Sequence, residues 1–272
     1  MRSHNESHAE TEFWLTYEQF GSCVEDAVRF SETRMGVYHT GRQNRALTTY
    51  TKAITHCISM VAIIRAFERS SRGTRLLDHF SIGALGRVVL DAMLMTMYIS
   101  ELSLTRDQWD LRRHLLFLHD LNNRKRFMSH LKPSGGSVDT KFINSYPSAK
   151  ARIIAKIKKI GKELEYPNAE IDKFTQGQLV FTGGVQGAVR EAGWNVPLYA
   201  FYQTYLSNQI HSHPVSFLRA EEHDISFQEP SPFQLDFVKT VFDAIIPYLE
   251  ETINRMKKFT GSASYDPVGQ LD

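Results

Sequence analysis

Apolar residues recur at steps of three and four along most of this 272-residue chain, and no run alternates apolar and polar residues as a half-buried strand would. This spacing is typical of amphipathic helices, each with one apolar face. The first such pattern begins at Phe13, and the last opens at Ser231 with Pro232 in its first turn. The periodicity predicts an all-α, bundle-like domain of about seven helices.

One predicted helix, over about 81–104, is apolar on nearly all sides. Such a helix is either the centre of a protein core or a membrane span. Arg87 and Asp91 interrupt the apolar run and leave it shorter than the roughly 20 residues that cross a bilayer. We therefore expect a buried core helix and no membrane contact.

Polar and turn-forming residues mark the expected limits of the domain. We expect residues 1–10 to be a disordered start, residues 11–260 to form a single helical domain, and residues 261–272 to be a disordered tail. Loops are predicted over 132–147 and 165–197, with one short helix over 185–192 in the second loop. Between the two loops, residues 148–164 are predicted to form a short basic helix.

Composition limits the classes of protein that fit. The 32 Lys and Arg nearly balance the 30 Asp and Glu, so a net charge of +2 provides no strong overall attraction to nucleic acid or acidic membranes. Cys23 and Cys57 are far apart in helical patterns, which argues against a disulfide framework and a four-thiolate zinc site. Residues 1–10 lack the apolar stretch of a secretory signal. These features predict a cytoplasmic protein.

Arg87 and Asp91 lie four residues apart in the apolar helix, so their side chains share a face and are expected to form a pair. Removing two charges from water is costly, and a buried pair often stabilises a fold no better than apolar residues do. Arginine also binds the anionic groups of ligands. The pair therefore has two interpretations, a structural role in fixing the helix and a role in binding a ligand.

A second polar group lies near the end of the helix predicted over 198–212. Ser207 and His211 share a face there, with Asn208 and His213 beside them. Because imidazole exchanges protons near neutral pH, Ser207 and His211 are candidate catalytic residues, with Asn208 and His213 as candidate ligand contacts. The chain has no Gly-x-Ser-x-Gly elbow, so a histidine that simply forms a hydrogen bond at a helix end is the alternative.

The Arg87-x-x-x-Asp91 helix, together with Tyr202 and Tyr205 ahead of Ser207 and His211, resembles the bacterial all-helical domain-of-unknown-function family 5677 over about residues 45–260. That family carries an Arg-x-x-x-Glu on a central helix and a Ser-x-x-x-His near the end of a later one. The resemblance implies that Arg87, Asp91, Ser207 and His211 form one polar cluster inside the bundle. It implies no activity, and Asp91 stands where the family has a longer Glu.

A different motif, Arg113 followed by His119, is similar to the Arg-His spacing of HEPN ribonucleases, and Arg124 with His130 repeats it. This resemblance implies RNA cleavage without a metal, as in a toxin or phage-defence effector, with the site usually at a dimer interface. Within a helix rich in Arg and His, the same spacing also occurs on a solvated face.

The basic helix over 148–164 could serve such an activity. Its candidate contacts to RNA phosphates are Arg152, Lys156 and Lys159, although basic helix faces are often only solvated. The histidines form no His-Glu-x-x-His or Glu-x-x-His motif, so no metal site and no cofactor are expected.

These observations favour a buried polar pocket that binds a small anionic or phosphate-bearing ligand. In that hypothesis, Arg87 binds the anion, Asp91 orients Arg87 or His211, and Ser207 fixes the imidazole. A metal-independent ribonuclease and a non-catalytic helical interaction protein are the alternatives, and whether the chain is an enzyme stays open. The expected partner is a small anion or RNA, with a homodimer as an option.

Overall fold

The computed structural model describes residues 2–70, 75–131, 133–211, 213–223, 225 and 228–261. Within these residues the chain forms ten α-helices and no strand, and 80% of the described residues lie in helices. The all-α prediction is confirmed, and the number of helices exceeds the seven expected. The additional helices are short and lie in segments rich in Gly and Pro.

The chain divides into two compact units, where a single domain was expected. The bundle unit comprises Met1–Glu101 and Trp194–Asp272, and the hairpin unit comprises Leu102–Gly193. In sequence, the hairpin unit is therefore an insertion between two segments that fold together.

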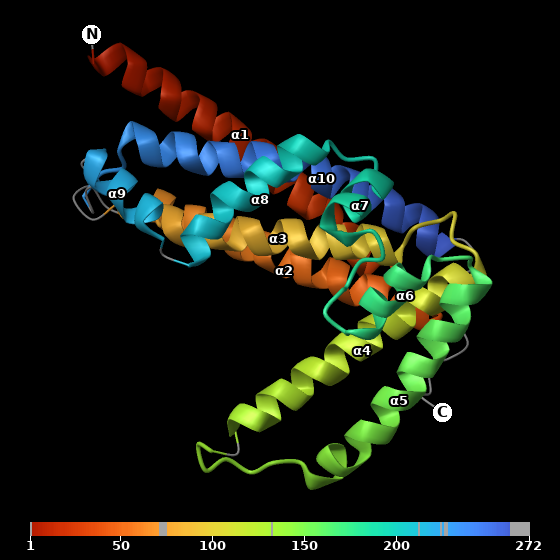
Figure 1. Ribbon diagram of the computed structural model, residues 1–272. Coiled ribbons are helices and arrows are strands. Elements are labelled where there is room, and N and C mark those ends of the chain that lie inside the picture. The colour runs from red at the N-terminus through yellow and green to blue at the C-terminus, as the bar shows by residue number, and fades with distance from the viewer. Residues whose placement is uncertain are drawn as a thin grey trace. The chain divides into compact units, whose positions relative to one another are not determined.

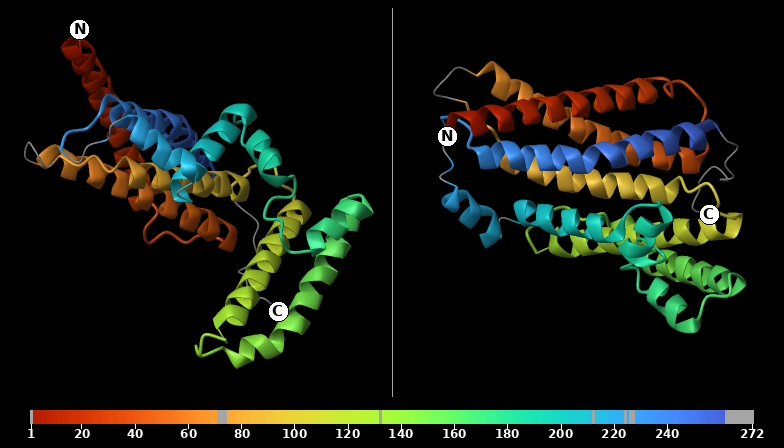
Figure 2. Two further views of the ribbon diagram at one scale, coloured as in Figure 1. Left: turned by 60° about the vertical axis from the view of Figure 1, so that its left-hand side comes forward. Right: turned by 90° about the horizontal axis from the view of Figure 1, so that it is seen from above.

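The bundle unit contains six helices: α1 (Arg2–Glu32), α2 (Gly41–Arg69), α3 (His79–Ile99), α8 (Val196–Ile210), α9 (Pro214–Glu222) and α10 (Pro232–Gly261). Helix α3 packs against α2, α8 and α10, and α1 packs along α10 (Figure 1). The long helices of this unit run side by side (Figure 2). Since α3 has neighbours on several sides, its nearly all-round apolar sequence is explained by burial in the core.

Two glycines allow the close packing of α3. A Cβ atom on Gly86 would lie 2.6 Å from Val241 Cγ1 of α10. A Cβ atom on Gly83 would lie 2.8 Å both from Gln209 Cγ of α8 and from Phe237 Cζ of α10. Both separations are shorter than carbon atoms tolerate, so any side chain at these positions would push α8 or α10 away from α3.

Helices α2 and α3 are long and apolar enough to cross a membrane, judged by length and composition alone. In α3, 67% of the most apolar stretch is buried in the protein, against 33% in α2. The core helix of a globular fold has the same composition as a membrane span, so this criterion is weak evidence for membrane insertion.

The hairpin unit contains α4 (Arg106–Leu131), α5 (Thr140–Glu163), α6 (Asn168–Thr175) and α7 (Gly184–Glu191). Helices α4 and α5 form a helical hairpin (Figure 1), and α6 packs against both of them. Its core is a cluster of apolar side chains from three helices: Leu111, Leu115, Leu118, Ile153, Ile157, Ile160 and Phe174. The apolar faces of α4 and α5 are therefore buried against each other.

Helices α4 and α10 each begin with a capping box, and the predicted start of α10 at Ser231 is confirmed. The Thr105 N–H donates to Gln108 Oε1 over 2.9 Å, and the Gln108 N–H donates to Thr105 Oγ1 over 3.3 Å. Ser231 and Gln234 form the same pair of bonds ahead of α10.

Other boundaries differ from those predicted. Helix α5 begins at Thr140, inside the predicted 132–147 loop, because the Asp139 carboxylate accepts a hydrogen bond from the Phe142 N–H over 3.0 Å, and the helix continues through Pro147. Helix α6 lies in the predicted 165–197 loop, and α9 lies in a segment for which no helix was predicted. Helix α1 begins at Arg2, within the start that was expected to be disordered. Residues 262–272 of the expected disordered tail lie outside the described residues.

Candidate functional site

Arg87 of α3 and Ser207 of α8, far apart in the sequence, meet inside the bundle unit. Arg87 Nε donates a hydrogen bond to Ser207 Oγ over 3.0 Å, and the arginine side chain is only 13% exposed. The Ser207 hydroxyl in turn donates to the Gln203 carbonyl oxygen over 2.6 Å. Because its proton is committed to that carbonyl, Ser207 is suited to orienting Arg87 and not to nucleophilic attack.

Asp91 lies beside Arg87 on α3, as the four-residue spacing predicts. Arg87 Nη1 forms an ion pair with Asp91 Oδ2, and the aspartate side chain is 53% exposed. The pair therefore joins a buried residue, Arg87, to a residue at the surface of the bundle unit, Asp91. Apart from its ion pair with Asp91, Nη1 is a buried nitrogen with no hydrogen-bond partner among the described residues.

Tyr199 adjoins this pair, and two further aromatic side chains pack around Tyr199. Burial, and after it the Asp91 carboxylate, raises the pKa of the Tyr199 hydroxyl above its ordinary value. The Trp194 ring lies 5.8 Å from the Tyr199 ring and 4.4 Å from the Tyr248 ring, centroid to centroid. Trp194 Nε1 and the Tyr248 hydroxyl are buried without a hydrogen-bond partner in the described part of the chain. A buried polar atom in that condition costs about 1–3 kcal/mol, which binding of a ligand or water would relieve.

His211 is not in this cluster, contrary to the expectation that it joins Arg87, Asp91 and Ser207. Helices α3 and α8 run antiparallel (Figure 1), since Gly83 faces Gln209 whereas Leu90 O accepts from the Tyr199 hydroxyl. Where Arg87 meets Ser207, Asp91 then lies one turn toward the end of α3, and His211 lies one turn in the opposite direction. Two turns correspond to about 11 Å along the helix axes.

His211 instead belongs to a group at the end of α8. It is the C-cap residue of α8, is exposed, and its ring lies 5.3 Å from the His213 ring. His213 Nδ1 lies 3.2 Å from Asn208 Oδ1. These contacts are those of an ordinary helix end, and no group of three or more metal-ligating side chains occurs in the described residues.

The two residues of the HEPN-like motif do not meet on α4. Arg113 pairs with Asp110 over 3.0 Å, and the His119 ring lies 3.1 Å from Asn123 Nδ2. Residues six positions apart on a helix point about 120° away from each other and lie about 9 Å apart along its axis. Within the hairpin unit, each residue of the motif therefore has its own local partner.

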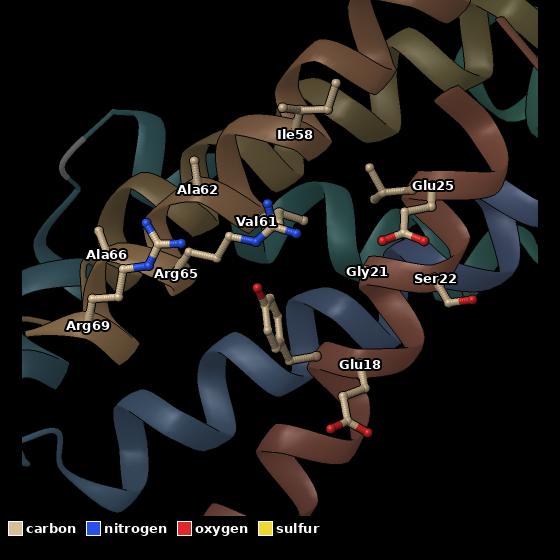
Figure 3. A pocket seen from close by; sticks show the side chains of 12 residues that line it. Glu18, Gly21, Ser22, Glu25, Ile58, Val61, Ala62, Arg65, Ala66 and Arg69 are labelled. Atoms are coloured by element: carbon tan, nitrogen blue, oxygen red, sulfur yellow. The ribbon is translucent and has the colours of Figure 1, made fainter. Parts of the chain in front are cut away.

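Two open grooves of the bundle unit lie elsewhere. The first, of about 610 Å³, runs between α1 and α2 and is lined by Glu18 and Glu25 of α1 and by Arg65 and Arg69 of α2 (Figure 3). The second, of about 470 Å³, is lined by residues of α1 and α10. Neither groove is lined by Arg87, so the Arg87–Ser207 contact lies outside both of them.

Comparison of the chain with protein-family models, curated proteins and solved structures found no match. The resemblance to family 5677 stays a prediction.

Sequence reasoning missed the aromatic part of the cluster. Tyr199 and Tyr248 occur at helical spacing and so look like ordinary core residues, and Trp194 precedes a helix in a predicted loop. It also missed the ion pair in the hairpin unit between Arg112 of α4 and Glu191 of α7, in which the arginine is only 6% exposed. No pattern in the sequence connects these two positions.

Proposed function

We propose that the bundle unit binds a small ligand through a carboxylate or phosphate group at the Arg87 guanidinium. The observation that carries this proposal is the hydrogen bond from Arg87 Nε to Ser207 Oγ, which joins two helices and fixes the plane of the guanidinium. A fixed arginine loses little conformational freedom when it binds an anion, and the N–H groups at Nη1 can donate to that anion in place of Asp91.

The ion pair with Asp91 does not prevent this binding. Asp91 is half exposed, so its carboxylate can return to water when Arg87 releases it. A hydrogen bond from arginine to a charged oxygen contributes about 1.5–3 kcal/mol. Exchange of Asp91 for a ligand oxygen is therefore favourable when the ligand adds further contacts.

Trp194 and Tyr248 supply those further contacts. Both carry a donor that is buried without a protein partner in the described residues, and both contact Tyr199, which adjoins Asp91. A ligand with several oxygen atoms would satisfy them together with Arg87.

These features support a binding function more than a catalytic one. The Ser207 hydroxyl donates its proton to the Gln203 carbonyl oxygen, so the serine is not activated as a nucleophile in the cluster. The proposal includes a cytoplasmic, bacterial protein of family 5677, on the resemblance in the Arg87 and Ser207 helices.

Thermal unfolding with inorganic phosphate, pyrophosphate, citrate and adenosine monophosphate as probes tests the proposal. A ligand at 100 times its dissociation constant stabilises the folded state by about 2.7 kcal/mol. We expect at least one probe to raise the melting temperature of the wild type, and Arg87→Lys to abolish this shift because lysine lacks the planar fork. Ser207→Ala should weaken the shift.

Arg29→Lys is the matched control, since Arg29 pairs with Asp26 on an exposed helix face. It should retain the full shift. Equal shifts in the wild type and in Arg87→Lys, or no shift with any of the four probes, would contradict the proposal.

A further inference from the structure

Positive charge is concentrated in the hairpin unit. Residues 121–162 contain 11 of the 32 Lys and Arg but only one of the 30 acidic residues, Asp139. Residues 121–162 therefore carry a net charge of about +10, and the rest of the chain carries about −8. The small total of +2 is the sum of these two opposite charges. The carboxylate of Asp139 is occupied in capping α5, where it accepts from the Phe142 N–H. It is thus poorly placed to neutralise the basic side chains.

The basic side chains follow both helices of the hairpin. Arg152, Lys156 and Lys159 are exposed along one stripe of α5, where Lys159 also pairs with Glu163 over 3.7 Å, and the apolar face beside this stripe is buried against α4. Nearer the connection between the helices, aromatic rings hold three further cations. Arg124 lies 4.4 Å from the centre of the Phe142 ring, and Lys125 and Lys150 lie 5.9 and 5.8 Å from that of Tyr146. These cations are partly ordered before any partner binds.

An exposed aromatic ring accompanies this charge. Phe127 of α4 is 60% exposed, and Arg126 lies 5.9 Å from its ring centre. Nucleic-acid bases stack on such rings, whereas phosphates pair with the cations around them. Phe127 therefore places an exposed aromatic ring on the helix that pairs with the basic helix α5.

We propose that the α4–α5 hairpin binds the phosphodiester backbone of a nucleic acid, with Arg152, Lys156 and Lys159 on phosphates and Phe127 stacked on a base. This site is separate from the proposed anion site at Arg87 and does not depend on it. The 24 residues of α5 span about 36 Å, which is the length of about ten nucleotides of a strand in a duplex.

A membrane surface is the less suitable partner. A helix that lies in a membrane interface inserts a continuous apolar face between the lipids. In α5 that face is formed by Ile153, Ile157 and Ile160, and it is buried in the core of the hairpin unit. The exposed side of α5 has charge but no apolar surface to insert.

Fluorescence anisotropy with a labelled, mixed-sequence RNA of about 20 nucleotides tests the proposal, since that length exceeds the span of α5. The same sequence as DNA, single-stranded and duplex, shows which backbone is preferred. The variant Arg152→Gln/Lys156→Gln/Lys159→Gln removes three charges from α5. The control Lys52→Gln/Lys257→Gln/Lys258→Gln removes three exposed charges from the bundle unit.

We expect the wild type and the control to bind alike and the α5 variant to bind at least tenfold more weakly. Because each phosphate contact adds about 0.7 to the slope of log affinity against log salt for a single strand, the α5 variant should lower that slope by about 2. Phe127→Ala should weaken binding to single strands more than to duplex.

Three results would overturn the proposal: no binding to any of the three nucleic acids, equal loss in the α5 variant and the control, or binding to vesicles of phosphatidylserine and phosphatidylcholine that exceeds binding to every nucleic acid. Circular dichroism of each variant verifies that the helices are intact, so that a loss of binding is not a loss of fold.

Discussion

His79, at the start of α3, is a buried histidine of the bundle unit. Its side chain is 3% exposed, packs against the ring of Phe80 at 4.0 Å, and lies with Nδ1 3.2 Å from Gln234 Nε2 of α10. Burial lowers the pKa of this imidazole, an effect that the Leu77 carbonyl and Asp78 only partly offset. The folded protein therefore holds His79 neutral.

A pH dependence of stability follows from His79. A histidine whose pKa is lower in the folded state takes up its proton more readily when the chain unfolds, so the folded state loses stability as pH falls below the ordinary value of about 6.5. The free energy of unfolding should fall more steeply between about pH 6.5 and pH 5 in the wild type than in His79→Gln. Urea unfolding of both proteins at several pH values measures this difference, and parallel curves would contradict it.

At the scale of the element, the packing of α3 depends on Gly86. Alanine there gains about 1 kcal/mol of helix propensity but places a methyl group 2.6 Å from Val241 Cγ1, and overpacking of a core costs about 1–3 kcal/mol. We expect Gly86→Ala to lower the free energy of unfolding by up to about 2 kcal/mol.

Gly21 is the matched control for Gly86. It lies in the middle of α1, and a Cβ atom there would have no neighbour within 4 Å. Gly21→Ala should therefore raise the free energy of unfolding by about 0.5–1 kcal/mol. If denaturant unfolding gave both variants the same sign of change, close packing of α3 against α10 would not be what requires glycine at position 86.

The sequence predicts the elements better than their connections. Periodicity and capping boxes identify the long helices, because three-residue and four-residue steps are local properties of the chain. Helices α6 and α9 are missed because they contain only eight and nine residues. So short a segment has too few apolar residues to show a helical period. The Arg87–Asp91 pair follows from local spacing, whereas its contact with Ser207 was implied only by the family resemblance.

What periodicity cannot supply is the direction in which two helices cross. The relative direction of α3 and α8 determines which side chains lie near Arg87. Because the two helices are antiparallel, Asp91 and His211 lie on opposite sides of the Arg87–Ser207 contact. The aromatic neighbours Trp194 and Tyr248 come from a loop and from α10, so they too depend on long-range packing.

At the scale of the whole molecule, the two units carry opposite charge. Repulsion among the basic side chains of residues 121–162 destabilises the hairpin unit, and salt screens that repulsion, since the Debye length falls from about 30 Å at 0.01 M to about 8 Å at 0.15 M ionic strength. Amide hydrogen exchange at the C-terminal end of α4 and the N-terminal end of α5 should slow as the sodium chloride concentration is raised over this range.

Amide hydrogen exchange in α3 provides the reference. This helix of the bundle unit is largely apolar and carries the Arg87–Asp91 pair. Its exchange should change little over the same range. Faster exchange of the hairpin at higher salt would contradict the charge argument, because it would mean that ion pairs and not repulsion dominate there.

The most direct test of the central claim, that Arg87 is an anion-binding group held by Ser207, is proton–nitrogen correlation NMR of the arginine Nε–H groups. The Arg87 signal is assigned by its loss in Arg87→Lys. We predict that it moves saturably on titration with the probe that raises the melting temperature, while the Arg29 signal stays in place, and that Ser207→Ala shifts it before any ligand is added. An Arg87 signal that remains unmoved while that probe binds would contradict the claim.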